Sequence, residues 1–229
     1  MGDAKTQKDS GGLYRGLAAF DMDGTLLDGR LVLSLARQLG VEEKVRERMR
    51  AFGGKPGFEQ TTAIASLFAG ATTKDIENAV ESIPLARNCE KTISALREMS
   101  YVVGIISDSY TIVAGYVASR LGIDFVAANI LEIKQGRATG RVEMPLGWER
   151  IGCFCNISVC KRFHLEKFAD QTRVGIDKTI AIGDTKSDIC MIERAGVGIA
   201  FMPKDPEIAK ATENIISDGD LYKVLSFLP

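Results

Sequence analysis

The chain lacks the residues and motifs on which several common phosphate-handling enzymes depend. Among its 229 residues there is one histidine, His164, and no glycine-rich loop that ends in Lys-Ser or Lys-Thr. These absences argue against histidine phosphatase, protein-kinase and P-loop nucleotide chemistry. No apolar run is long enough to span a membrane, and the N-terminus is polar rather than signal-like. We therefore expect a soluble, cytoplasmic protein with no membrane partner.

An excess of charge of either sign is also missing. The chain contains 29 Lys and Arg against 30 Asp and Glu, which gives a net charge of −1. Because nucleic-acid-binding domains usually present a basic surface, we expect no nucleic-acid partner. The basic residues of segment 44–50 mix with Glu42, Glu43 and Glu47, which is typical of a solvated helix face.

Cysteine is scarce and unevenly placed, which makes a disulfide framework improbable for the five that occur. Cys153, Cys155 and Cys160 lie close enough in sequence to suggest a soft-metal site. However, no fourth ligand follows at the expected spacing, although His164 stands four residues after Cys160. Small buried side chains or surface thiols are the favoured interpretation, and the role of this group stays open.

What is present is a hydrophobic content of 45%, sufficient for a sizeable core. Buried β-rich segments alternate with helical ones, a rhythm typical of a parallel sheet covered on both faces. The segment 29–84 interrupts it with four helical patterns and no strand. We predict an α/β protein with a Rossmann-like parallel sheet core and an inserted small all-helical cap. The expected parts are a flexible tail at 1–16, a core at 17–28 and 85–229, and a cap at 29–84.

Polar residues stand where several of these strands end. Asp21 and Asp23 follow the apolar run 17–20, and side chains two apart on a strand point the same way. Ser107 follows a second strand, and Asp184 a third, with Asp188 four residues later. Because parallel strands present their ligand sites at their carboxyl ends, these groups should meet at one edge. Crowded carboxylates need a cation or a proton, and Mg²⁺ prefers oxygen ligands.

The helix predicted at 160–169 carries Lys161 in its first turn, where the helix dipole disfavours a positive charge. This lysine should therefore have a partner elsewhere. Combined with the carboxylates and the hydroxyl, it makes a constellation suited to phosphoryl transfer: a nucleophile, an acid/base, a cation and groups that stabilise charge on the phosphoryl oxygens.

The same residues resemble the haloacid dehalogenase (HAD) superfamily. Its four motifs are matched in order by Asp21-Met22-Asp23-Gly24-Thr25, Ile105-Ile106-Ser107, Lys161 and the segment 183–188. The helical insert lies between the first two, where this family places its first type of cap. The phosphoserine phosphatase-like branch is the most similar, with its four-helix cap, a Phe-Glu-Gln stretch at 58–60 and a short hairpin before the third motif.

The resemblance implies roles for individual residues. Asp21 would be the nucleophile and Asp23 the general acid/base. Ser107, Asp108 and Lys161 would bind the transferring phosphoryl group. Mg²⁺ would be held by Asp21, Asp184 and the main-chain carbonyl of Asp23, supported by Asp188. The partner would be a small phosphorylated metabolite, and the protein a monomer or a homodimer.

The chain also departs from that branch. Arg30 stands where phosphoserine phosphatases have a glutamate for the substrate's amino group, and Ala63 where they have an arginine for its carboxylate. Arg30 would attract an acid rather than an ammonium group. The second motif continues with Asp108 and Ser109 instead of two glycines, and a similar Ser-Asp pair occurs in the phosphoserine:homoserine phosphotransferase branch. We predict a Mg²⁺-dependent phosphatase for a small phosphomonoester. The alternatives are a phosphotransferase and a non-enzymatic binding protein.

Overall fold

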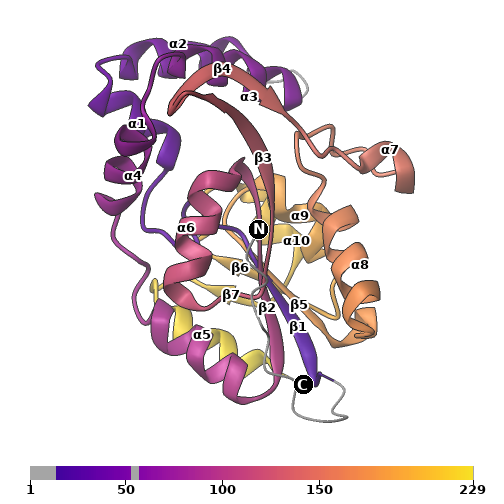
Figure 1. Ribbon diagram of the computed structural model, residues 1–229. Helices are drawn as coiled ribbons and strands as arrows, with labels where there is room; N and C mark the ends of the chain where they lie inside the picture. Colours follow the sequence, from indigo (N-terminus) through magenta and orange to yellow (C-terminus); the bar gives the residue numbers. More distant parts are fainter. Residues whose placement is uncertain (1–13, 53–56, 229) are drawn as a thin grey trace.

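The computed structural model of the protein describes residues 14–52 and 57–228. Most of the tail predicted at 1–16 lies outside these residues, and Gly16 already belongs to the first strand. A single sheet runs through the molecule (Figure 1). Its strands are β1 (Gly16–Phe20), β2 (Tyr101–Tyr110), β3 (Phe125–Lys134), β4 (Arg137–Glu143), β5 (Thr179–Gly183), β6 (Val197–Phe201) and β7 (Ile215–Ile216).

The strand order is β4-β3-β2-β1-β5-β6-β7, and every neighbouring pair is parallel except β3 and β4. The central strand β1 shows why both faces must be covered. Leu17 and Ala19 join one hydrophobic cluster, whereas Ala18 and Phe20 join the other. This alternation follows from the two-residue period of a strand, and it confirms the predicted α/β class.

Helices pack against each face of the sheet. The cluster around Ala18 and Phe20 includes residues of α5 (Cys89–Glu98) and α6 (Thr111–Leu121). The cluster around Leu17 and Ala19 includes residues of α8 (Lys161–Thr172), α9 (Ile189–Ile192) and α10 (Pro206–Ala211). In Figure 1, α5 and α6 lie to the left of the central strands and α8 lies to the right. Short 3₁₀ turns complete this part: η2 (Ile176–Lys178), η3 (Lys186–Asp188) and η4 (Leu221–Phe227).

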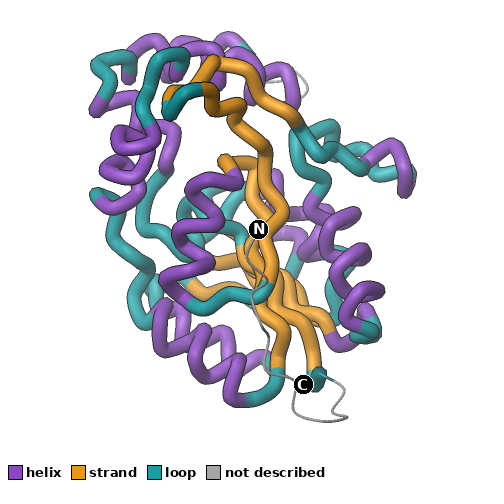
Figure 2. The backbone as a smooth tube through the Cα atoms, in the orientation of Figure 1, coloured by secondary structure: helices purple, strands orange, loops and turns teal. Residues whose placement is uncertain are grey.

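A separate group of helices lies beyond the carboxyl ends of the strands (Figure 1). It contains α1 (Leu31–Gln38), α2 (Glu42–Ala51), α3 (Gly57–Ala65), η1 (Ser66–Phe68) and α4 (Thr73–Glu81). The β3–β4 hairpin leaves the sheet and reaches these helices (Figure 2). Ala138 of β4 accepts a backbone hydrogen bond of 2.8 Å from Gly70 and donates one of 2.8 Å to Ala71. Within the described ranges, no helix is both long and apolar enough to cross a bilayer.

The structure differs from the sequence-based expectations in a few elements. The hairpin before the third motif is continuous with the sheet, because β3 pairs first with β2 and then with β4. The segment after β5 is divided between the turn η3 and the short helix α9. The short helix α7 (Trp148–Ile151) and the turn η4 were not predicted.

Candidate active site

Strand register brings the predicted motifs together. Phe20 at the end of β1 lies opposite Ile105 of β2 and Ile182 of β5. Asp21, one residue further, donates its backbone N–H to the Ile182 carbonyl at 2.8 Å. Since Ser107 and Asp184 each stand two residues beyond these partners of Phe20, the three motifs occupy one edge of the sheet, as the sequence predicted.

Lys161 is the first residue of α8, and its side chain is fully buried. Its ammonium donates to Asp21 Oδ1 at 2.6 Å and to Asp188 Oδ1. Burial alone would lower the pKa of Lys161, but Asp188 and Asp21 outweigh it and hold that pKa well above its ordinary value. The partners expected for this unfavourably placed lysine are therefore two carboxylates of the site.

Asp188 is itself held from two sides. Its Oδ2 accepts the backbone N–H groups of Asp184 and Thr185, each at 3.0 Å. This approach requires Gly183, because a Cβ there would lie 2.2 Å from Asp188 Cγ. Asp188 thus fixes both the turn after β5 and the ammonium of Lys161.

The carboxylates of Asp21, Asp184 and Asp188 form a group in which one oxygen from each lies within 4.8 Å of the others. Burial raises the pKa of both Asp21 and Asp184 above the ordinary value. Asp184 Oδ1 is buried, and the described residues offer it no hydrogen-bond partner. An unmatched buried carboxylate oxygen beside two further carboxylates is the donor set that a hard cation such as Mg²⁺ prefers.

The loop after β6 supplies a contact that was not predicted. Lys204 Nζ donates to Asp184 Oδ2 at 2.6 Å, and the Lys204 backbone N–H donates to the Asp184 carbonyl at 2.8 Å. Lys204 follows a strand of the same parallel sheet, so the rule that identified the other residues could have found it.

Gly24 adopts a φ of +96°, and a Cβ there would lie 2.2 Å from Asp184 Oδ2.

Asp23 faces the helical insert. Its Oδ1 accepts the backbone N–H of Leu31, the first residue of α1, at 2.5 Å. Burial raises the pKa of Asp23 to about 6, and the Leu31 N–H opposes part of that rise. A carboxyl group with a pKa near neutrality can both give and take a proton. The sequence placed Asp23 beside Asp21 but gave no sign of its bond to the insert.

A cavity of about 130 Å³ opens at this edge of the sheet. The core side of its lining includes Asp21, Asp23 and Asp108, and the insert contributes Arg30, Val32, Met49, Gln60, Thr61 and Ile64. None of these lining residues from the insert is acidic. Because cavities for drug-sized ligands usually measure about 300 Å³ or more, this one suits a small molecule.

The second motif forms part of the same edge. Ser107 is fully buried, and its hydroxyl accepts the Ser109 backbone N–H at 3.1 Å. Ser107, Asp108 and Ser109 lie inside β2, where its pairing with β3 is irregular between Ile106 and Tyr110, and not beyond the end of the strand as the sequence predicted. Asn129 of β3 donates to the Asp108 carbonyl at 2.6 Å, and Asp108 and Ser109 line the cavity. The structure thus brings together Asp21, Asp23, Arg30, Ser107, Asp108, Lys161, Asp184 and Asp188.

Comparison with known proteins agrees with this arrangement. The family pattern described as haloacid dehalogenase-like hydrolase matches residues 18–193. A phosphoserine phosphatase from Methanocaldococcus jannaschii is 32% identical over 214 residues, which cover 93% of this chain and 97% of the relative. One from Streptomyces coelicolor is also 32% identical over 214 residues, and there the match spans half of the relative's length.

A solved structure described as a phospho-aspartyl intermediate analogue of phosphoserine phosphatase superposes with a TM-score of 0.81. The two sequences are 30% identical, and the match covers 93% of this chain and 99% of the other.

Proposed function

This chain belongs to the family of haloacid dehalogenase-like hydrolases, and from that premise we propose how its site works and what it accepts. It is a phosphoric monoester hydrolase similar to phosphoserine phosphatases. The observation that carries the proposal is the buried contact of Lys161 with Asp21 and Asp188, next to an Asp23 whose pKa lies near neutrality.

In the first half of the reaction, Asp21 attacks phosphorus and forms an aspartyl phosphate while the bond to the leaving oxygen breaks. Protonated Asp23 gives its proton to that oxygen, so the product leaves as an alcohol. In the second half, ionised Asp23 takes a proton from water as the water attacks phosphorus. The bond to Asp21 then breaks, and inorganic phosphate is released. A pKa of about 6 allows Asp23 to serve in both protonation states.

Two groups stabilise charge around the phosphoryl group in this scheme. Lys161, which is buried and charged, holds Asp21 in place and offsets negative charge on the phosphoryl oxygens. The Ser107 hydroxyl and the neighbouring part of β2 at Asp108 would provide further polar contacts to the phosphoryl group. Exclusion of water from this buried edge strengthens each of these interactions.

Asp21, Asp184 and the Asp23 main-chain carbonyl would hold Mg²⁺, with Asp188 in support. The partnerless Asp184 Oδ1 and the shared location of three carboxylates support this assignment. When bound, Mg²⁺ would neutralise phosphoryl oxygens and act as a Lewis acid.

The helical segment 29–84 would act as a cap over a core made of 17–28 and 85–229. The bond from Leu31 to Asp23 links the first cap helix directly to the acid/base. Cap residues supply much of the lining of the small cavity, so a bound substrate would be enclosed on the side opposite the carboxylates.

The cap determines which leaving group is accepted. Arg30 lines the cavity, and the described cap residues beside it offer no carboxylate to an ammonium group. We therefore assign Arg30 to an acidic group on the substrate, such as a carboxylate beyond the phosphoester oxygen. A charge-assisted hydrogen bond of this kind is worth about 1.5–3 kcal/mol, or roughly 10- to 100-fold in kcat/KM.

Three substrates separate the groups that could be recognised. O-phosphoserine carries a carboxylate and an ammonium group, O-phosphoethanolamine keeps only the ammonium group, and 3-phosphooxypropanoate keeps only the carboxylate. Relative to O-phosphoserine, we expect kcat/KM to be unchanged for 3-phosphooxypropanoate, which lacks the ammonium group. For O-phosphoethanolamine, which lacks the carboxylate, we expect kcat/KM to fall about 10- to 100-fold. Arg30→Ala should remove this preference. Arg37→Ala, on the exposed side of α1 beside Glu42, should not change it.

The outcomes test the two parts of the proposal separately. Loss of turnover with Asp21→Asn on every substrate is expected from the mechanism, and full activity of that variant would contradict it. If wild-type turnover requires the ammonium group, or if Arg30→Ala leaves all three kcat/KM values unchanged, the assignment of Arg30 is wrong while the phosphatase mechanism stands.

A further inference from the structure

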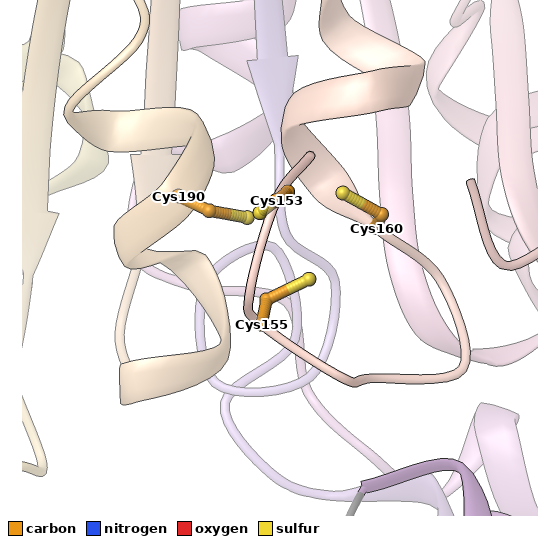
Figure 3. A group of neighbouring side chains, drawn as sticks. All are labelled: Cys153, Cys155, Cys160 and Cys190. Atoms are coloured by element: carbon orange, nitrogen blue, oxygen red, sulfur yellow. The ribbon is translucent and has the colours of Figure 1, made fainter. Parts of the chain in front are cut away.

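Four of the five cysteines converge at one place away from the cavity. Cys153 and Cys155 lie in the loop between α7 and α8, Cys160 immediately precedes α8, and Cys190 lies on α9. All four Sγ atoms lie within 4.8 Å of one another, and all four thiols are free. Figure 3 shows their side chains pointing toward a common centre. We call this group the tetrathiol cluster.

The geometry of the tetrathiol cluster is close to that of a single metal ion with four sulfur ligands. Zn–S bonds of about 2.3 Å in a tetrahedron place the sulfurs about 3.8 Å apart. The sulfurs of the tetrathiol cluster lie no more than 4.8 Å apart, and small side-chain rotations would bring them to the tetrahedral separation. Four thiolates in a tetrahedral arrangement are typical of zinc or iron, whereas hard cations choose oxygen.

Backbone N–H groups support three of the sulfurs. Amides from the loop and from the first turn of α8 donate to the thiols of Cys155, Cys160 and Cys190; the donors are those of Ile157, Phe163 and Arg162, respectively. Hydrogen bonds from outside the ligand set orient metal ligands and stabilise their charge.

The location of the tetrathiol cluster connects it to the rest of the molecule. Cys160 directly precedes Lys161, and Cys190 stands two residues after Asp188. The loop that carries the other two cysteines also touches helix α3: Thr61 Oγ1 donates to Ser158 Oγ at 3.1 Å. A metal ion here would tie together the beginnings of α8 and α9 and the loop on which α3 rests.

We propose that the tetrathiol cluster binds one Zn²⁺ in a closed tetrahedral site. Four protein thiolates leave no open position for substrate, so the ion is structural. Binding converts the four thiols to thiolates and releases their protons to solvent, with no change in oxidation state. The site lies outside the carboxylate group that would hold Mg²⁺.

Metal content of the full-length chain tests this proposal. The protein is produced with added Zn²⁺ and washed with a chelator to strip ions held by carboxylates. We expect roughly one zinc per chain in wild type and less than about a tenth in Cys190→Ser. The matched control is Cys89→Ser, because Cys89 is a buried cysteine of α5 outside the tetrathiol cluster and should leave the zinc content unchanged.

A second measurement does not depend on the folding of a variant. Reconstitution of wild type with Co²⁺ should give the thiolate-to-cobalt charge-transfer bands that only sulfur ligands produce. Asp184→Asn should keep both the zinc and these bands.

Three results would overturn the proposal. The first is a purified protein without metal, whose cysteines are all free or joined in disulfides. The second is iron in place of zinc. The third is bound zinc that is lost in Asp184→Asn but kept in Cys190→Ser.

Discussion

Replacing Lys161 with methionine tests the electrostatic balance of the site. Methionine keeps most of the aliphatic stem but removes the charge that contacts Asp21 and Asp188. Three buried carboxylates within 4.8 Å of one another would then have lost their fully buried counter-charge. Because buried like charges are unfavourable, we expect the folded variant to take up one more proton than wild type.

The cost of that proton can be worked out from linkage. A carboxyl group that is neutral in the folded chain and ionised in the unfolded chain costs about 1.4 kcal/mol per pH unit above its unfolded pKa of about 3.9. Lys161→Met should therefore lower the free energy of unfolding by about 4 kcal/mol at pH 7 and about 1.5 kcal/mol at pH 5. Breaking a buried ion pair typically costs about 3–5 kcal/mol, which agrees with the larger value.

The sign of the pH dependence follows from the direction of the shift. Removing Lys161 raises the folded-state pKa of one carboxyl group further above its unfolded value. The deficit is therefore smallest below the unfolded pKa and grows as the pH rises toward the folded pKa. Urea denaturation of both proteins at pH 5 and pH 7, in buffer with a chelator, measures this difference.

Lys167→Met provides the matched control, because Lys167 is an exposed lysine on the same helix. Its stability should stay within about 0.5 kcal/mol of wild type at both pH values. A deficit for Lys161→Met below about 1 kcal/mol at pH 7, or one that does not shrink at pH 5, would refute the reasoning.

Three further predictions concern backbone, proton and product. Gly24→Ala should destabilise the protein by about 2–4 kcal/mol in thermal unfolding, because the new Cβ would collide with Asp184 and Lys204 and the residue has a positive φ. The control is Gly115→Ala on α6, where a Cβ meets open space, and it should be neutral or stabilising. Burial lowers the pKa of His164 to about 4. As the pH falls, the unfolded chain therefore binds a proton on this histidine before the folded chain does, which destabilises the wild type. Between pH 7 and pH 4.5, the free energy of unfolding of His164→Asn should fall by about 2 kcal/mol less than that of wild type. With excess homoserine, inorganic phosphate should still account for all substrate consumed, whereas a phosphorylated acceptor would indicate phosphotransfer.

Much of the architecture could be predicted because local patterns and the global fold agree. The run 17–20 alternates between two cores, as the two-residue period of a strand requires. The site followed from one general rule: ligand groups gather at the carboxyl ends of parallel strands. Register between β1, β2 and β5 then places Asp21, Ser107 and Asp184 together without further information.

Features that depend on contacts between distant elements could not be predicted in this way. The β3–β4 hairpin extends to the helices of 31–81 because backbone groups at Gly70 and Ala71 pair with Ala138. The bond from Leu31 to Asp23 joins a helix start to a strand end across a turn. Neither contact leaves a periodicity in the sequence, since hydrophobic patterns report which side of an element is buried and not what covers it.

The tetrathiol cluster shows the same limit for metal ligands. Spacing patterns detect sites whose ligands come from one or two short loops, because such loops fix the distance between sulfurs. Here Cys153, Cys155 and Cys160 are local, but Cys190 follows after a helix, a strand and two 3₁₀ turns. Its position is set by the packing of α9 against α8 and by the place of β5 beside β1 in the sheet. The sequence around the first three cysteines therefore contains no fourth sulfur at ligand spacing, because Cys190 is brought to them by the sheet topology and not by the local sequence.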